Sequence, residues 1–464
     1  MIDTQEIRKK ILSLALTGKL VEQNSSDTPA HQLVESLSGS LNNHPFENDI
    51  SAQEIPYEIP DSWVWCRLSD IGTTNIGLTY HPQDVAEDGT IVIRSSNIIK
   101  GKMDYADLVK VKCQIRENQY LKRNDIVICA RNGSKALVGK CAIYEGDSDV
   151  ISFGAFMAIF RTPFFQYAYL YFNSPVFRRN FSNDDSKQIN QVTQNILKNS
   201  LIPIPPEEEQ KRITDKINSV FSFLDTIDTL QSQYQDNLAT LKSKIIDAGI
   251  QGKLTEQLPE DGTAEELYQQ IHTNQGIEKK DIADINADLP EIPFTWCWVH
   301  LGDIVRVLGG KRIPAGRKLT TEDTGHKYIR ISDMKNRSVD AEKLLFVPED
   351  IYPSIAQYII HKEDVYITVA GTIGRVGKIP ESVDGANLTE NADRLVFSNL
   401  DQDWLIYCLT STFVQKQIEY LTTQVAQPKL AIKRIQEFLL PLPPLAEQKR
   451  IVAKLEELLP LCEG

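Results

Sequence analysis

The sequence predicts an α+β (mixed α/β) fold in which two globular domains are separated by long antiparallel coiled-coil helices, as a pseudo-two-fold tandem repeat. Three observations predict it: matching segments recur at nearly one spacing, one stretch carries a long heptad pattern, and the remaining blocks mix β-branched runs with helical stretches. The chain has 464 residues, enough for roughly two to four domains. Its 41% hydrophobic and 24% charged residues are typical of a globular protein.

An internal repeat organises the chain. Four pairs of segments match at spacings of 233 to 238 residues: 11–23 with 245–257, 58–71 with 291–304, 93–98 with 329–334, and 203–213 with 441–451. Chance would not place four matches in one order at almost one spacing, so the chain is a tandem duplication. Between the matched segments the two copies differ strongly. Either a common scaffold carries two different recognition surfaces, or an old duplication has drifted.

The clearest helix signal follows the first Pro-Pro pair. Apolar residues alternate at spacings of four and three at Ile213, Ile217, Val220, Leu224, Ile227, Gln231, Tyr234, Leu238, Leu241 and Ile245, with only Gln231 polar. This heptad pattern predicts a long helix packed on another helix, which ends at Gly249 and Gly252. About 42 residues at ~1.5 Å each give a rod of roughly 60 Å, which we interpret as a spacer.

Both ends of the chain repeat parts of this pattern. The start of the pattern recurs at Ile451, Leu455 and Leu458, and its finish recurs at Ile7, Ile11 and Leu14. We therefore expect both ends to dock on the central helix and to close the chain into a pseudo-two-fold ring. The alternative is that they form separate short core helices.

The blocks between these helices predict mixed domains. Strands are expected in the β-branched runs 91–93, 125–128 and 365–369, helices at 164–181 and 403–420, and one short helix in each of the polar linkers 24–57 and 258–290. The expected divisions are an N-terminal helical segment and linker (1–57), a first globular domain (58–203), a central long helix and linker (204–290), a second globular domain (291–441) and a C-terminal helical segment (442–464).

The net charge of −13 alone argues against a nucleic-acid partner, but the charge is unevenly distributed. Residues 61–200 hold 17 basic and 14 acidic side chains, and residues 291–440 hold 18 and 19. The remaining segments hold 15 basic and 30 acidic side chains. The acidity lies in the connecting segments, so the two near-neutral blocks are compatible with DNA binding.

Several classes of protein are disfavoured. No apolar run approaches the length of a membrane span, and the N-terminus lacks the basic-then-apolar order of a signal peptide. The seven cysteines include no CxxC pair, which indicates reduced cytosolic thiols rather than disulfides or a zinc site. A phosphate loop, HExxH, GxSxG and an adenine-methyltransferase turn are all missing, whereas the Asp…Glu-x-Lys nuclease pattern is too loose to decide. We predict no catalytic residues and no metal site.

Small polar and basic residues gather in loops beside the predicted strands of both blocks. The candidate DNA-binding residues are Arg94, Ser96, Asn97, Lys100, Lys102, Arg131, Asn132, Ser134, Lys135, Lys140, Lys311, Arg312, Arg330, Ser332, Thr368, Thr372, Arg375, Asn387 and Asn391. Arg and Asn can read guanine and adenine edges with paired hydrogen bonds, whereas Ser, Thr, Lys and glycine amides hold phosphates. An ordinary solvated loop explains any single residue equally well, and only the clustering in both copies favours DNA. We interpret the paired tryptophans Trp63/Trp65 and Trp296/Trp298 as core anchors.

These motifs resemble the specificity (S) subunit of Type I restriction–modification systems over essentially the whole chain. The most specific motif is Pro-hydrophobic-Pro-Pro…Glu-Gln-Lys-Arg-Ile, at 203–213 and again at 441–451. The Gly-Lys-Leu-Thr-Glu-Gln sequence at 252–257 and the Trp-x-Trp domain starts also fit. The stretch 133–156 looks like one subtype of target-recognition domain.

The resemblance implies a non-catalytic DNA sequence-recognition subunit. Two target-recognition domains would each read one half of a split double-stranded DNA target, and paired helices would set the unread spacer. The chain would bind no cofactor itself. It would recruit modification (methyltransferase) subunits that use S-adenosylmethionine and restriction subunits that use ATP and Mg²⁺, in the cytoplasm of a bacterium or archaeon. Because it begins with a helical fragment, it resembles a circularly arranged or a shortened member.

Two alternatives stay open at this point. One is a degenerate S-like scaffold that organises partners without reading DNA, and the other is a self-sufficient DNA-modifying enzyme. Activity of the pure protein with Mg²⁺ or S-adenosylmethionine would favour the enzyme. Because the connecting segments are acidic, we expect the isolated chain to bind DNA weakly and the complex with modification subunits to bind it tightly.

Overall fold

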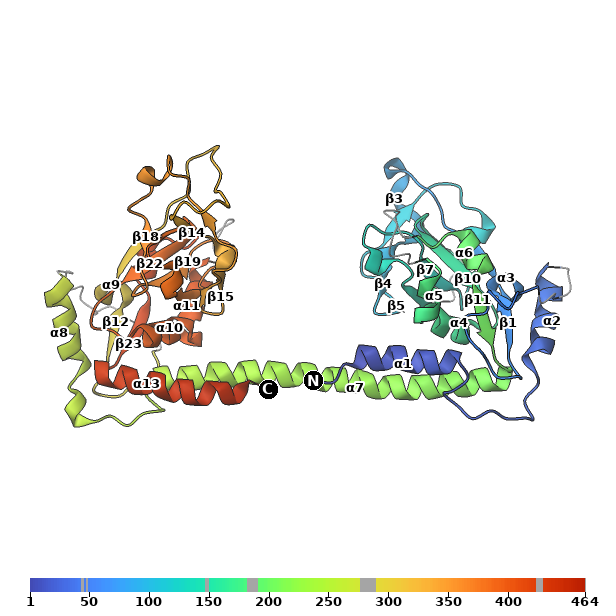
Figure 1. The fold of residues 1–464 in the computed structure, drawn as a ribbon, viewed down its shortest axis with the longest axis horizontal. Helices are drawn as coiled ribbons and strands as arrows, with labels where there is room; N and C mark the ends of the chain where they lie inside the picture. Colours follow the sequence, from blue (N-terminus) through green and yellow to red (C-terminus); the bar gives the residue numbers. More distant parts are fainter. Residues whose placement is uncertain are drawn as a thin grey trace. The chain divides into compact units, whose positions relative to one another are not determined.

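The computed structural model describes residues 1–42, 46, 49–146, 150–181, 191–275, 289–422 and 429–463 (Figure 1). The chain splits into two compact units, Met1–Ser232 (unit 1) and Gln233–Gly464 (unit 2). The boundary falls inside the 44-residue helix α7 (Glu207–Ile250), so each unit includes one part of that helix. Parts of the two linkers expected at 24–57 and 258–290 lie outside the described residues.

Unit 1 is a mixed domain, as the sequence predicts. Its helices before α7 are α1 (Thr4–Leu16), α2 (Ala30–Asn42), α3 (Leu68–Ile71), α4 (Phe165–Phe172), α5 (Pro175–Arg179) and α6 (Gln194–Asn199). Its strands are β1 (Val64–Arg67), β2 (Thr73–Ile76), β3 (Val85–Ile93), β4 (Ile98–Ile99), β5 (Lys102–Met103), β6 (Val109–Val111), β7 (Ile126–Cys129), β8 (Cys141–Ile143), β9 (Ile151–Phe153), β10 (Met157–Arg161) and β11 (Leu201–Ile204).

Unit 2 repeats this order. Its helices after α7 are α8 (Ala264–Gln275), α9 (Leu301–Ile304), α10 (Gln402–Thr410), α11 (Thr412–Thr422), α12 (Ile432–Gln436) and α13 (Leu445–Leu458). Its strands are β12 (Cys297–His300), β13 (Arg306–Gly309), β14 (Lys327–Ile329), β15 (Met334–Lys335), β16 (Ser338–Val339), β17 (Leu345–Phe346), β18 (Ile359–Ile360), β19 (Val365–Thr368), β20 (Val376–Lys378), β21 (Ala386–Leu388), β22 (Ala392–Val396) and β23 (Leu439–Leu442).

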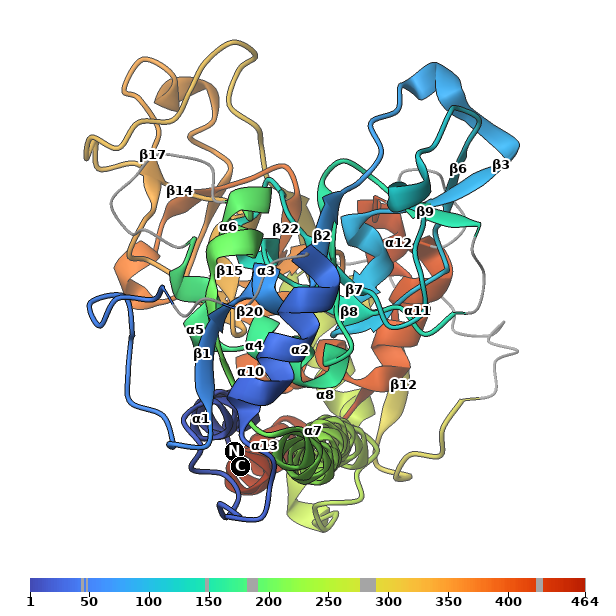
Figure 2. The ribbon, with the colours of Figure 1, turned by 90° about the vertical axis from the view of Figure 1, so that its right-hand side faces the viewer.

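The sheets of the two units correspond strand for strand where the sequence matches. Unit 1 has a four-stranded sheet in the order β2-β10-β7-β8, and unit 2 has the same arrangement in β13-β22-β19-β20. A two-stranded ladder joins the start of each domain to its end, β1 to β11 and β12 to β23. The smaller sheet β6-β3-β9 lies at the end of unit 1 that is farther from α7 (Figure 2). The predicted tandem repeat and α+β class are confirmed.

The central strand of each unit has the sequence expected for a buried strand. β7 and β19 are buried along their whole length, which suits their β-branched residues. Successive side chains of a strand point to opposite faces. Ile126 and Ile128 accordingly join the core beneath the helices, whereas Val127 packs in a second core against the smaller sheet. A single strand thus supports two cores.

Each end of the chain docks on α7 within its own unit, as predicted. In unit 1 α1 runs antiparallel to α7, because Thr4 Oγ1 donates to Asp228 and the later residue Arg8 pairs with Asp225 (Figure 1). In unit 2 α13 is antiparallel to α7 as well. A Cβ on Gly249 would lie 3.1 Å from the Leu455 side chain, so the two helices are in close contact there, and Glu463 pairs with Lys242.

The heptad seam is buried only where a partner helix covers it. Ile213 and Ile217 are fully buried and Leu224 nearly so, but Tyr234 is 52% and Leu241 46% exposed. This pattern of burial agrees with the prediction that the two ends of the chain pack on α7 and leave its middle uncovered. One predicted seam position was wrong. We expected Leu14 to pack on α7, but it is 42% exposed. Helix α1 buries Leu12, Ala15 and Leu16 instead, because its core-facing stripe is rotated about the helix axis.

The Glu-Gln-Lys-Arg motif forms a joint between each domain and its helix. The buried Glu209 accepts hydrogen bonds from Trp63 Nε1 (2.9 Å) and Gln23 Nε2 (2.6 Å). Burial raises the pKa of Glu209, and these two hydrogen bonds oppose that rise. Gln210 donates to the carbonyl oxygen of Pro205, and Arg212 pairs with Asp27.

Unit 2 builds the same joint from its own copy of the motif. Glu447 accepts from Trp296 Nε1 (2.8 Å) and from Gln257 Nε2 (2.9 Å), and Arg450 pairs with Asp261. Gly252, at φ +71°, leaves room for Pro293, which a Cβ would meet at 2.5 Å. Trp63, Trp65 and Trp296 are buried, which confirms their interpretation as core anchors, whereas Trp298 is half-buried.

The two predicted helical stretches are each broken once. α4 and α5 replace the stretch 164–181, and α10 and α11 replace 403–420. Ser174 Oγ donates to Tyr171 O and accepts from Phe177 N at the first break. Ser411 Oγ makes the equivalent bonds with Cys408 O and Val414 N. Serine thus ends one helix and caps the next in both units.

Candidate functional site

The first candidate loop of unit 1 is a turn that follows β3. The Arg94 amide donates to Asn97 Oδ1 (2.9 Å), and the buried Asn97 Nδ2 donates to the carbonyl oxygens of Asp104 and Asp107. The Arg94 guanidinium pairs with the Asp107 carboxylate at 2.8 Å. Asn97 therefore shapes the loop from inside, whereas Ser96, Lys100 and Lys102 are exposed on it.

Unit 2 has the same turn with other side chains. The Arg330 amide donates to Asp333 Oδ2 (2.9 Å), and the guanidinium forms two further bonds to the same carboxylate, at 2.9 and 2.7 Å. Ser332 beside it is exposed. Arg94 and Arg330 are thus structural counterparts, and in both units a short hairpin follows, β4–β5 or β15–β16.

The second pair of loops connects the central strand to the edge strand of the large sheet. In unit 1 the Cys129 amide donates to Lys140 O (2.8 Å), and in unit 2 the Thr368 amide donates to Arg375 O (2.8 Å). Gly139 and Gly374 precede these residues at φ +81° and +84°, where glycine is favoured. Lys140 and Arg375 therefore occupy the same place in the two units.

In unit 1 the second loop meets the first. Asn132 Nδ2 donates to Ser95 Oγ (3.1 Å), and Asn132 Oδ1 accepts from the Ser134 amide (3.0 Å). Arg131, Ser134 and Lys135 are exposed beside this contact. The structure thus brings the predicted residues 94–102 and 131–135 together on one surface.

In unit 2 the remaining predicted residues lie at two places. Lys311 and Arg312 follow β13; the Lys311 amide bonds to Leu388 O, and Arg312 pairs with Glu390 next to Asn391. Thr372 is exposed in the β19–β20 loop. Thr368 and Asn387 are buried: Thr368 Oγ1 accepts from the Arg375 amide (2.9 Å), and Asn387 Nδ2 donates to Ile355 O (2.8 Å).

Two notable residues were not among the candidates. Phe156 is 61% exposed beside the second loop, and the Arg131 guanidinium lies 5.7 Å from its ring centroid. Asp393 is buried on β22, and no described residue bonds to its Oδ2. Burial raises the pKa of Asp393 to about 6, opposed by the charge of Lys429. The sequence signal for it was an acidic residue inside the short strand Ala392–Val396, next to Arg394.

The described residues offer no other site for metal chemistry. They contain no cluster of three His, Cys, Asp or Glu side chains that could hold a metal ion. All seven cysteines are free thiols. Within the same residues, no helix is long and apolar enough to cross a membrane.

Comparison with known proteins identifies the class. Residues 60–234 and 293–462 each match the Type I restriction modification DNA specificity domain, and the chain belongs to this family. The resemblance seen in the sequence is thereby confirmed. The chain is a DNA-recognition subunit of that class and not one of its catalytic components.

Individual relatives support this family assignment. The chain is 25% identical over 540 residues to the EcoAI specificity subunit of Escherichia coli, covering 99% of this chain and 89% of that protein. It is 25% identical over 418 residues to the EcoKI specificity subunit of Escherichia coli K12, covering 86% and 83%. A chain in a solved structure of the type I R-M system has a TM-score of 0.62 at 19% identity, covering 88% of this chain and 93% of that one.

Proposed function

We propose that each unit reads one half of a split double-stranded DNA target. The observation that carries this proposal is the contrast within each unit: one shared backbone frame presents different side chains at matching places. Arg131, Asn132 and Lys135 occupy one loop in unit 1, whereas the matching loop of unit 2 presents Thr372. Loops on a rigid frame are where binding residues concentrate. The recognition domains are residues 58–203 and 291–441, and residues 204–290 carry the spacer helix.

The exposed candidates would contact DNA directly, and the buried ones would hold the loops in shape. The exposed Arg131 can form paired bonds with a guanine edge, and the half-buried Asn391 can form them with an adenine edge. Lys100, Lys102, Lys135 and Lys311 suit phosphates, which position the protein without reading sequence. Asn97, Thr368 and Asn387 would affect DNA binding indirectly, because their side chains hold the backbone of the loops that carry the exposed candidates.

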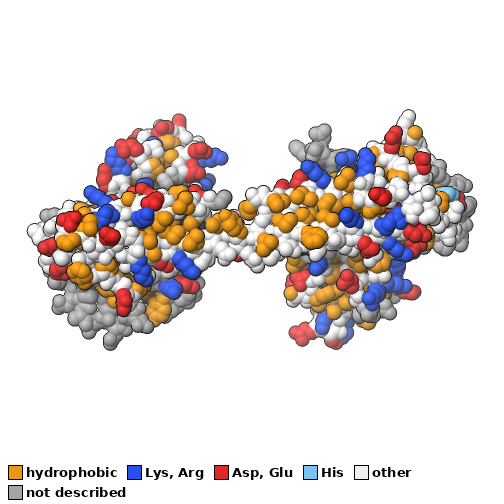
Figure 3. Space-filling view, turned by 90° about the horizontal axis from the view of Figure 1, so that it is seen from below, with side chains coloured by type: hydrophobic (Ala, Val, Ile, Leu, Met, Phe, Trp, Pro, Cys, Tyr) orange, Lys and Arg blue, Asp and Glu red, His pale blue; other side chains and the backbone are white. Residues whose placement is uncertain are grey.

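We further propose that α7 and its two partner helices receive the modification subunits. Phe223, 69% exposed, and Leu230, 58% exposed, lie on the unit 1 part of α7, and the exposed Tyr234 and Leu241 lie on the unit 2 part. Apolar side chains gather along this helix (Figure 3). Exposed apolar patches of this kind mark protein interaction sites.

The complex would supply the chemistry that this chain lacks. Modification subunits would use S-adenosylmethionine to methylate adenine, and restriction subunits would use ATP and Mg²⁺ to move along DNA and cut it, in the cytoplasm. Because this chain has a net charge of −13, its own affinity for DNA is weak, and the partner subunits supply the remaining DNA contacts.

The test is co-expression with the neighbouring modification subunit, followed by genome-wide mapping of N6-methyladenine. A motif of two short half-sites around a fixed gap is the expected result. If the complex assembles and its methyltransferase is competent but no new methylation appears, the scaffold alternative replaces this proposal. Methylation or cleavage by the purified chain alone would favour the enzyme alternative.

A further inference from the structure

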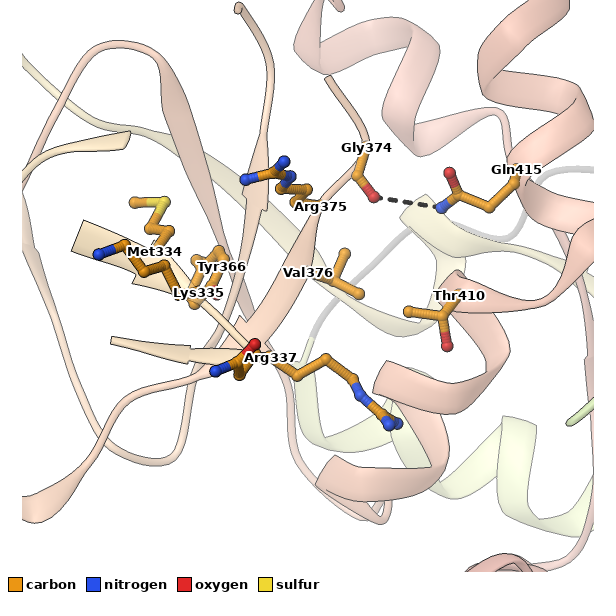
Figure 4. Close-up of a pocket in the computed structure, with 10 residues that line it drawn as sticks. Met334, Lys335, Arg337, Tyr366, Gly374, Arg375, Val376, Thr410 and Gln415 are labelled. Carbon is orange, nitrogen blue, oxygen red and sulfur yellow. Dashed lines mark hydrogen bonds between the residues drawn. The ribbon is translucent and has the colours of Figure 1, made fainter. Parts of the chain in front are cut away.

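Unit 2 contains an open cavity of about 550 Å³ between the β15–β16 hairpin, the large sheet and the junction of α10 with α11 (Figure 4). Its lining residues are Met334, Lys335, Asn336, Arg337, Tyr366, Gly374, Arg375, Val376, Thr410 and Gln415. The lining includes three cations and no acidic side chain. Such a cavity favours an anion.

The cations come from two different loops, so the cavity is where these loops meet. Arg337 lies in the hairpin, and Arg375 closes the β19–β20 loop (Figure 4). Lys335 already pairs with Asp340 at 3.4 Å. Among the described residues, none forms a hydrogen bond or an ion pair with the Arg375 guanidinium, which is exposed. The Arg337 guanidinium lies 4.9 Å from the Tyr407 ring centroid, which orients it without neutralising its charge.

The walls of the cavity are fixed by hydrogen bonds. Tyr366 Oη donates to Ser338 O (2.9 Å), which holds the hairpin to the central strand. The Lys378 amide donates to Arg337 O (3.1 Å), and Gln415 Nε2 donates to Gly374 O (3.1 Å) just before Arg375. Both arginines are therefore presented from backbone that is already ordered.

The backbone at Arg337 adds an independent observation. The two turn residues of the hairpin, Asn336 and Arg337, have φ of +50° and +58°. Two-residue hairpin turns with positive φ at both positions prefer Asn-Gly, because a side chain at the second position is strained there. Unit 1 has glycine at this position, Gly101. Strain of this kind persists at binding sites, where the side chain serves a purpose.

The same junction is closed in unit 1. Tyr169 Oη donates to Gly101 O (3.0 Å), and a Cβ on Gly101 would lie 2.5 Å from that hydroxyl. Lys140, the counterpart of Arg375, donates to Ile98 O (3.0 Å). The cationic cavity is thus a property of unit 2 and not of the shared frame.

We propose that Arg337 and Arg375, on opposite sides of this cavity (Figure 4), each bind one phosphate group, and that in the assembled complex these groups are two backbone phosphates of the bound DNA. The proposal rests on the proposed DNA-binding function. It assigns both arginines to positioning the duplex, independently of the base sequence. Guanidinium groups bind phosphate with paired, charge-assisted hydrogen bonds.

The test compares the parent complex with Arg337→Gly and Arg375→Ala complexes on DNA with and without the methylated motif. Each variant should reduce the slope of log affinity against log salt by about 1, on both DNAs, because each removes one phosphate contact. The methylated motif should stay the same. Arg337→Gly also relieves the strained turn, so the melting temperature of this variant should equal that of the parent. Lys110→Ala, at an exposed cation on β6 of unit 1, is the control for loss of charge alone.

Each other outcome is decisive. A changed half-site in the methylated motif would assign these arginines to base reading and overturn the proposal. An unchanged salt slope would exclude the DNA backbone as the ligand. In that case, binding of pyrophosphate to the purified full chain, lost in the double variant, would leave a free phosphate compound as the ligand, and no binding would overturn the site altogether. The parent complex could also bind DNA with and without the motif equally, while the variants still show a reduced salt slope. That result would refute recognition of a DNA sequence but support this phosphate site.

Discussion

Units 1 and 2 share a frame and differ in what they place on it. The joint is nearly identical in both, Glu209 with Trp63 in one and Glu447 with Trp296 in the other. The junction between hairpin and helix is closed over Gly101 in unit 1 but open beside Arg337 in unit 2. Residues that recur therefore hold the fold, and residues that differ between matching places are the ones to test for recognition.

The joint should show the largest effect on stability. Glu447→Ala leaves Trp296, Gln257 and Thr255 without their shared acceptor, so unit 2 should lose about 2 to 4 kcal/mol of unfolding free energy. Hydrogen exchange should accelerate at β12 and β23 but stay unchanged in unit 1. Glu208→Ala, at an exposed glutamate beside the unit 1 joint, is the control. Equal acceleration in both units would mean that their stabilities are coupled.

The recognition surface of unit 1 should give the next largest effect. Arg131→Ala in the complex should weaken binding to the methylated motif about 10- to 100-fold, the value of one paired base contact. It should leave the melting temperature unchanged, because Arg131 is exposed. Lys110→Ala, at an exposed cation on β6, controls for loss of charge alone. Equal weakening by both variants would contradict a base contact at Arg131.

A smaller effect on stability should come from Asp393 in the large sheet of unit 2. The pKa of Asp393 rises to about 6 in the folded chain, whereas an unfolded Asp titrates near 3.9. The folded state therefore binds an extra proton between these values, and this group costs stability as the pH rises through them. Asp393→Asn should gain about 1 kcal/mol over the parent at pH 7, after allowance for partial solvation, and nothing near pH 3.5. Urea unfolding at both pH values measures this gain in stability. An equal gain at pH 7 and pH 3.5 would contradict the raised pKa of Asp393.

The smallest effect on folding should come from the apolar surface of α7. Phe223→Ser removes a side chain that is 69% exposed, so the stability of the chain should change by less than about 0.5 kcal/mol. Assembly with modification subunits should nevertheless weaken, measured by co-purification at increasing salt. The matched control is Ser222→Ala on the neighbouring exposed position. Unchanged assembly would place the partner elsewhere.

The sequence predicted what depends on period and repetition. The heptad positions and the four matched segments established α7, its docked partners and the duplicated frame. It could not predict which candidates are buried, because Asn97 and Asn132 are chemically alike and only tertiary packing distinguishes them. It also missed the cavity beside Arg337, which is made by contacts between residues distant in the sequence, such as Gln415 with Gly374.

The most direct test of the account is N6-methyladenine mapping for three complexes: the parent, Arg131→Ala in unit 1 and Asn391→Ala in unit 2. The parent should methylate a motif of two half-sites around a fixed gap. Each variant should relax or change one half, a different half for each, and leave the gap length unchanged. Loss of specificity in both halves from either variant, or the same motif in all three complexes, would contradict the claim that each unit reads its own half-site.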